Sequence, residues 1–298
     1  MLNISRESEV NIVNTLIEIG AANMSTPIIE IIRDLSIASQ SHVIKRNMVD
    51  EEPLKVLSKI LPVVHMKEAV EHIPVGAFGN MSQTRITGIP SHEPTWLGTL
   101  KEYIHGEGWT DEVIDYFKSE IKDQPFPAAG AKGVLQVHSY NGICFASNGS
   151  HRLVGLVCYL AAKYGDSAIA KSVNHRGTVF DSDALALLQR LYGHSTTGIK
   201  LMSRMELEGN VEVGVSNLIN IDERYYTYKD GRFVLLWPQP ATRLQKLLKK
   251  DEIRKHQAKF EKQKYTILNH EDFKRLIETT WLTQALAIHN RTKRKNYV

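Results

Sequence analysis

The chain has little cysteine, no long apolar run and none of the common short catalytic motifs. Only 2 of its 298 residues are cysteines, which excludes a disulfide scaffold and fits a reducing compartment. The longest apolar stretch, residues 153–162, is too short for a membrane-spanning helix. No basic segment precedes an apolar core at the N-terminus, so we expect no secretory signal and a cytoplasmic location. P-loop, HExxH, paired CxxC and GxSxG motifs are all missing from the sequence.

What remains is an ordinary globular composition with an uneven distribution of charge. Hydrophobic residues make up 42% of the chain and charged residues 23%, which suits a soluble protein with a full core. The net charge is +4, yet residues 241–298 hold 15 Lys and Arg against 6 Asp and Glu. Such a basic segment indicates a polyanionic partner, with nucleic acid first, although a solvated helix face explains it equally well.

The most informative part of the sequence is residues 134–162. Asn141-Gly142 separates two apolar segments, which is the strongest short-range signal for a β-hairpin. The second strand leads through Ser147-Asn148-Gly149-Ser150-His151-Arg152 into an apolar helix. Helix N-termini attract anions, and an arginine fork fits phosphate. These six residues are therefore a candidate phosphate-binding site, and the alternative is a capped helix start in which His151 and Arg152 pair with nearby backbone or acidic groups.

Gly149-Ser150-His151-Arg152, after a hairpin and before an apolar helix, resembles the G-x-H-R signature of the ParB/sulfiredoxin superfamily. The resemblance implies an α/β (α+β) fold in which this loop holds nucleotide phosphates. It also implies a cytoplasmic ParB-like protein that binds, or also hydrolyses, a nucleoside triphosphate, ATP or CTP, with Mg²⁺. Association with DNA, nuclease activity and a homodimer are further properties that the resemblance allows. Sulfiredoxins carry their catalytic cysteine where Ser150 stands, so sulfiredoxin activity is not expected.

Two other functions are compatible with the same fold. One is a non-catalytic interaction or inhibitor protein of the kind that plasmids and phages carry. The other is a small-molecule kinase akin to the free-serine kinases. The sequence assigns no catalytic residue, no metal ligand and no membrane partner. Cys144 and Cys158 lie inside apolar runs, where we expect them to be small buried hydrophobic residues.

The chain is expected to contain three regions. These are a helical region over residues 1–70, a ParB/sulfiredoxin-like domain over 71–180, and an α+β region with a basic helical tail over 181–298. Within the first region, helices are predicted near residues 10–19, after Pro27 and over 53–60.

The third region contains several weaker signals. Helices are predicted over 182–191 and 199–207, and together they resemble the outline of a helix-turn-helix. Just before them, His175-Arg176 is predicted to lie in a loop or an edge strand. Asp230-Gly231 predicts a second hairpin, whose tyrosines either stack on bases or pack across strands. The candidate nucleic-acid-binding residues share one face of the predicted basic helix: Lys246, Lys249, Lys250 and Arg254.

Overall fold

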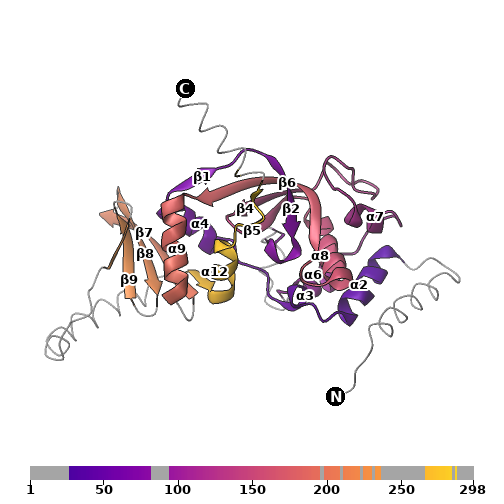
Figure 1. The fold of residues 1–298 in the computed structure, drawn as a ribbon, viewed down its shortest axis with the longest axis horizontal. Helices are drawn as coiled ribbons and strands as arrows, with labels where there is room; N and C mark the ends of the chain where they lie inside the picture. Colours follow the sequence, from indigo (N-terminus) through magenta and orange to yellow (C-terminus); the bar gives the residue numbers. More distant parts are fainter. Residues whose placement is uncertain are drawn as a thin grey trace, which may run out of the picture.

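The computed structural model describes residues 27–81, 94–194, 198–208, 211–221, 224–229, 232–235, 266–283 and 286, without the side chains of 194, 198, 200 and 202–235. This part of the chain has a mixed α+β fold, which confirms the fold class expected from the sequence. Figure 1 shows β6 crossing the top of the molecule, with α2, α6 and α8 at one end and β7, β8 and β9 at the other.

The central sheet is built around one long interior strand. Its strand order is β1-β6-β4-β5-β3, and β2 pairs with β6 beside β1. β4 and β5 form the predicted antiparallel hairpin, and β6 pairs in parallel with β4. The strands of this sheet are β1 (Val63–His65), β2 (Ala69–Pro74), β3 (Phe78–Asn80), β4 (Gln136–Tyr140), β5 (Ile143–Asn148) and β6 (Ile169–Phe180).

The position of His175-Arg176 differs from the prediction. Both residues lie in β6, which has neighbours on both edges, and not in a loop or an edge strand. The neighbours β1 and β2 come from a segment far upstream, so local sequence patterns do not reveal this pairing. Alternation along the strand separates the pair, because His175 is buried whereas Arg176 is exposed.

Helices pack on both faces of the central sheet. One core contains side chains of α2, α6, α7 and α8 with Val137 and Cys144 of the sheet. The other contains side chains of α4, α9 and α12 with Phe145 and Phe180. The helices are α2 (Ile28–Ala38), α3 (His42–Lys45), α4 (Glu52–Ile60), α6 (Trp96–Tyr103), α7 (Val113–Lys118), α8 (Ser150–Tyr164), α9 (Ser182–His194) and α12 (His270–Ile277), with a 3-10 turn η1 (Val75–Ala77) before β3.

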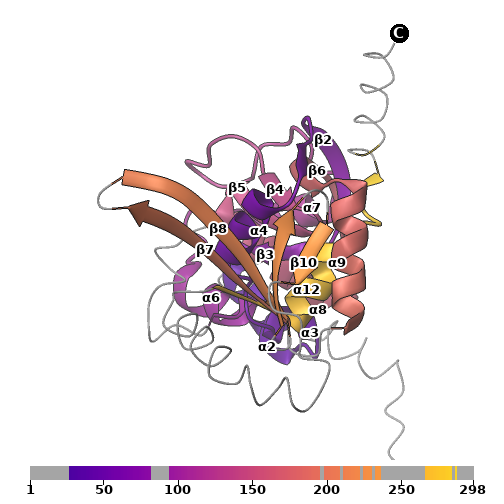
Figure 2. The ribbon, with the colours of Figure 1, turned by 90° about the vertical axis from the view of Figure 1, so that its left-hand side faces the viewer.

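A second sheet has the strand order β10-β9-β8-β7-β11. The hairpin predicted at Asp230-Gly231 is confirmed, since β9 and β10 pair antiparallel on either side of it. Figure 2 shows β7 and β8 extending as a long curved pair to one side of the molecule. The strands of this sheet are β7 (Gly198–Glu208), β8 (Val211–Ile221), β9 (Arg224–Lys229), β10 (Arg232–Leu235) and β11 (Thr266–Asn269).

The prediction of a helix-turn-helix was wrong. The first helix exists as α9, with Asp181 Oδ1 accepting a hydrogen bond from Ala184 N at 2.8 Å, but residues 199–207 lie in strand β7. Ile199 and Leu201 are buried on alternate positions, as in a strand. β7 pairs over most of its length with the adjacent strand β8, and its first residues also pair with the distant β11, so pairing on both edges gives this segment an extended structure.

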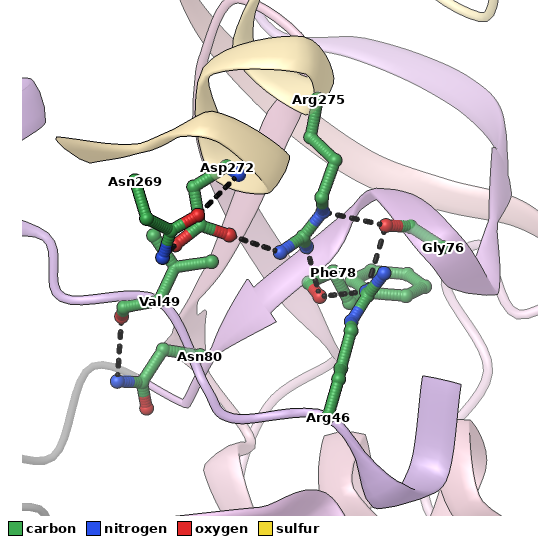
Figure 3. Close-up of polar contacts among 8 residues, drawn as sticks. All are labelled: Arg46, Val49, Gly76, Phe78, Asn80, Asn269, Asp272 and Arg275. Atoms are coloured by element: carbon green, nitrogen blue, oxygen red, sulfur yellow. Dashed lines mark hydrogen bonds and ion pairs between the residues drawn. The ribbon is translucent and has the colours of Figure 1, made fainter. Parts of the chain in front are cut away.

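Helix α12 and the residues that follow it, as far as the structure describes them, pack against the central sheet. Gly142 N donates to Leu276 O at 3.1 Å, and a Cβ atom at Gly142 would overlap the carbonyl oxygens of Arg275 and Glu278. Figure 3 shows Arg275 of α12 reaching the backbone beside β3. The core that contains Phe145 therefore includes residues from all three of the predicted regions.

Candidate functional site at the start of helix α8

The polar stretch of residues 147–152 forms a tight connection between a strand and a helix. Ser147 and Asn148 end β5, Gly149 is the N-cap residue, and α8 begins at Ser150. Gly149 has φ +83° and ψ +40°, in the left-handed region that favours glycine. A Cβ atom here would overlap the side chain of Arg152. The sequence prediction of a strand-to-helix connection is confirmed.

A β-bulge precedes this turn. Val137 pairs with Ala146 and Gln136 with Asn148, so Ser147 is an extra residue on β5. Its side chain is exposed. A bulge increases the local twist and redirects the chain, so it helps to set the direction in which α8 leaves the sheet.

Arg152 is buried and bound to the protein's own backbone. Its Nη1 donates to Gly133 O at 3.0 Å and its Nη2 to Lys132 O at 3.0 Å, while its guanidinium lies 5.3 Å from the ring centre of Phe126. The relative exposure of the residue is 6%. Arg152 therefore holds the segment before β4 against the first turn of α8, and its terminal nitrogens do not face an open site.

Asn148 and Ser150 have comparable partners. Asn148 Nδ2 donates to Val134 O at 2.7 Å, and Ser150 Oγ donates to Met81 O at 2.9 Å. Three of the six candidate side chains thus position the neighbouring backbone. This matches the alternative considered from the sequence, in which polar residues at the helix start pair with nearby backbone groups.

The groups left for a ligand are the first backbone amides of α8 and two basic side chains. The first N–H bond within the helix runs from Leu153 N to Gly149 O at 2.9 Å, so the N–H groups of residues 150–152 have no acceptor within the helix. His151 is exposed, and partial burial together with the nearby charge of His105 lowers its pKa. Lys132 is also exposed, in the segment held by Arg152. The amides, the helix dipole and the ammonium group of Lys132 together suit an anion, and His151, which its lowered pKa keeps neutral at neutral pH, can only donate a hydrogen bond there.

Lys132 is not among the candidates that the sequence predicts. The signal available was Gly130-Ala131-Lys132-Gly133, a lysine between glycines directly before the hairpin. Both glycines have positive φ, +78° at Gly130 and +62° at Gly133. Only the fold brings this segment to the start of α8, because the contact depends on hydrogen bonds from Arg152 and Asn148.

The remaining candidate chemistry of the chain is limited. Within the described ranges, no cluster of three or more His, Cys, Asp or Glu side chains is placed to hold a metal ion. The thiols of Cys144 and Cys158 are fully buried, as expected, and burial raises the pKa of both. No helix in the part of the chain that the structure covers is both long enough and apolar enough to cross a bilayer.

Two predictions fall outside the described residues. They are the helix near residues 10–19 and the basic helix that carries Lys246, Lys249, Lys250 and Arg254.

Comparison with protein-family models, with curated proteins and with solved structures finds no match to this chain.

Proposed function

We propose that the start of α8 binds the phosphates of a nucleoside triphosphate, and that the protein is a cytoplasmic, ParB-like protein that associates with DNA. The observation that carries this proposal is the set of amide donors at residues 150–152, accompanied by the exposed Lys132 and His151. The order of hairpin, glycine turn and apolar helix, on which the resemblance to the ParB/sulfiredoxin superfamily rests, supports the same proposal.

The proposed roles of the six residues differ from those expected from the sequence. Asn148, Gly149, Ser150 and Arg152 shape the turn and fix the segment that carries Lys132. The backbone amides, Lys132 and His151 contact the phosphates. Mg²⁺, if it is required, enters with the nucleotide and neutralises the charge between phosphate oxygens. No base or nucleophile is assigned, so the proposed function is nucleotide binding and does not include hydrolysis.

The test is a titration of ATP, CTP and their diphosphates with Mg²⁺ against wild type, Lys132→Glu and Lys122→Glu. Lys122 is also exposed but is not held by Arg152, which makes it the matched control. We expect Lys132→Glu to weaken nucleotide binding roughly tenfold or more, because a contact to a charged group contributes about 1.5–3 kcal/mol. Absence of binding to wild type, or equal losses in both variants, would refute the proposal.

A second function is favoured by one observation. The side chains of Asn148, Ser150 and Arg152 donate their hydrogen bonds to carbonyl groups of the protein itself. A turn with only a structural role would have such bonds, and this favours a non-catalytic interaction protein. In that case wild type binds no nucleotide, and substitution of exposed residues outside the turn abolishes the biological effect while Lys132→Glu is tolerated.

The association with DNA is a separate part of the proposal and rests on the basic segment 241–298. Lysine-rich contacts to phosphates are independent of sequence and fall steeply with salt concentration. Charge reversal of Lys246, Lys249, Lys250 and Arg254 is expected to weaken binding to unrelated duplexes and to flatten the salt dependence. Identical, salt-insensitive binding curves for wild type and variant would show that these four residues do not contact DNA.

A further inference from the structure

A row of polar side chains lies on the face of the central sheet opposite α8. Gln136, His138 and Tyr140 of β4 are partly exposed, whereas the intervening Val137 and Ser139 are buried. Side chains of a strand alternate between its two faces. Val137 packs in the core beneath α8, so His138 and its two neighbours belong to the other face. The stacking of the His138 ring on Phe145, with centres 5.6 Å apart, agrees with this placement.

The imidazole of His138 is held by a carboxylate. Its Nε2 lies 2.9 Å from Oε1 of Glu51, the residue at the N-terminus of α4. The second oxygen of Glu51 lies 3.2 Å from Lys55 Nζ. Burial alone would raise the pKa of Glu51, but the hydrogen bonds from His138 and Lys55 and the charge of Lys55 lower it, so the carboxylate is ionised at neutral pH.

This pairing fixes the chemical character of the other ring nitrogen. An ionised carboxylate only accepts hydrogen bonds, so Nε2 of His138 carries the proton in the bond to Glu51. In the neutral imidazole Nδ1 is then an acceptor with a fixed direction. The side chain of His138 is 30% exposed.

The row leads toward the turn at the start of α8. Gln136 pairs with Asn148, next to Gly149, and His138 follows two residues later along β4. At about 3.4 Å per residue, His138 lies roughly 7 Å along the strand from the level of the turn. Arg176 lies beside His138 on the parallel strand β6, is 69% exposed and forms an ion pair with Glu68 at 3.1 Å.

We propose that this face binds the nucleoside part of the nucleotide, with His138 Nδ1 accepting a hydrogen bond from an amino group of the base or a hydroxyl group of the sugar. The inference rests on the proposed function, since it takes the start of α8 as the place of the phosphates. Arg176 and Gln136 flank the same ligand. Because a polyphosphate has neither base nor sugar, the hydrogen bond to His138 Nδ1 would make the protein bind a nucleotide more tightly than a polyphosphate.

The experiment compares two probes, ATP or CTP with Mg²⁺ and inorganic tripolyphosphate with Mg²⁺, by calorimetric titration. The proteins are wild type, His138→Ala, His138→Asn and His42→Ala, the last an exposed histidine on α3 as control. We expect His138→Ala to weaken nucleotide binding roughly tenfold and to leave tripolyphosphate binding unchanged. His138→Asn keeps an acceptor near the position of Nδ1 and should restore most of the affinity. Thermal unfolding checks that each variant is folded.

Each other outcome has a defined meaning. If wild type binds tripolyphosphate and nucleotide equally well, or if His138→Ala and His42→Ala behave alike, the inference fails while the phosphate site stands. If His138→Ala weakens both probes to the same extent, the effect is on the turn, and the inference is again overturned. If wild type binds neither probe, the proposed function fails and this inference fails with it.

Discussion

Arg46 and Arg275 donate hydrogen bonds to the same two backbone oxygens, those of Gly76 and Phe78 (Figure 3). The four donor–acceptor distances lie between 2.8 and 3.1 Å. Arg46 follows α3 and Arg275 belongs to α12, so two distant parts of the chain meet at the start of β3. Burial and the charge of Arg275 lower the pKa of Arg46 to about 9. Asp272, whose Oδ1 lies 2.9 Å from Arg275 Nη1, partly balances this charge.

Replacement of Arg275 should therefore destabilise the protein strongly. In Arg275→Met, Asp272 would remain ionisable and only 14% exposed without its guanidinium partner. Breaking one side of a buried pair costs about 3–5 kcal/mol. We expect a loss of this order in the free energy of unfolding, measured by urea denaturation. Arg190→Met, at an exposed position on α9, serves as control and should change stability by less than about 0.5 kcal/mol. Similar values for the two variants would argue against a structural role of the pair.

The protein should also lose stability in mild acid through His175. This residue is 1% exposed, its Nε2 lies 2.8 Å from Ser139 Oγ, and its ring lies 5.3 Å from that of Trp281. Burial, and to a smaller extent the charge of His138, lowers its pKa from 6.5 to about 4. The unfolded chain binds a proton at a pH where the native state does not. The stabilisation is therefore present above about pH 6.5 and is lost as the pH falls toward 4.

The measurement is urea denaturation of wild type and His175→Gln between pH 7 and pH 4.5. About 1.4 kcal/mol per unit of pKa difference gives a loss of up to roughly 3 kcal/mol in wild type over the full range. His175→Gln does not titrate here, so its free energy of unfolding should depend less on pH. Because carboxylates contribute to both proteins, the difference between the two curves is the informative quantity. Parallel curves would show that His175 does not control the acid response.

The parts of the fold that the sequence predicted are those with local signals. Asn141-Gly142 marks the first hairpin, and the apolar run after Gly149 marks α8, and the structure contains both. Residues 199–207 are different: the apolar spacing suggests a helix, but the segment forms a hairpin with the adjacent β8, and its first residues also pair with β11, more than fifty residues away. The partners of Arg152 could not be predicted either. Its guanidinium suits a phosphate and a pair of carbonyls equally well, and only the three-dimensional position of Lys132 and Gly133 distinguishes them.

The turn at Gly149 provides a test of the proposed site that does not depend on a ligand. Gly149→Ala adds the cost of a positive φ, about 1 kcal/mol or more, and an overlap with the Arg152 side chain. Gly130→Ala is the control, since Gly130 has φ +78° but no neighbouring atom within 4 Å of an added Cβ. We expect Gly149→Ala to lower the melting temperature further than Gly130→Ala and to weaken phosphate binding. Equal shifts in melting temperature would mean that the contact between Gly149 and Arg152 contributes nothing.

Gly142 lies so close to the end of α12 that there is no room for a side chain at this position. An alanine there would place its Cβ against the carbonyl oxygens of Arg275 and Glu278, which are backbone atoms and cannot rotate away. The hydrogen bond from Gly142 N to Leu276 O at 3.1 Å would be disturbed as α12 shifts. Overpacking of this kind costs about 1–3 kcal/mol, and more where backbone must move. We expect Gly142→Ala to lower the free energy of unfolding by at least this amount.

The fluorescence of Trp281 is sensitive to a structural change at Gly142, because Trp281 Nε1 donates to Gly142 O at 3.4 Å and the side chain is buried. The fluorescence of Gly142→Ala should shift to longer wavelength relative to wild type, and the shift should vanish in a Trp281→Phe background. The control is Gly193→Ala on α9, where an added Cβ meets no atom within 4 Å. Alanine favours a helix over glycine by up to about 1 kcal/mol, so this variant should be neutral or slightly stabilised. If Gly142→Ala unfolds like Gly193→Ala with unchanged Trp281 emission, then α12 does not pack on the hairpin turn and the contact between the C-terminal helix and the central sheet is wrong.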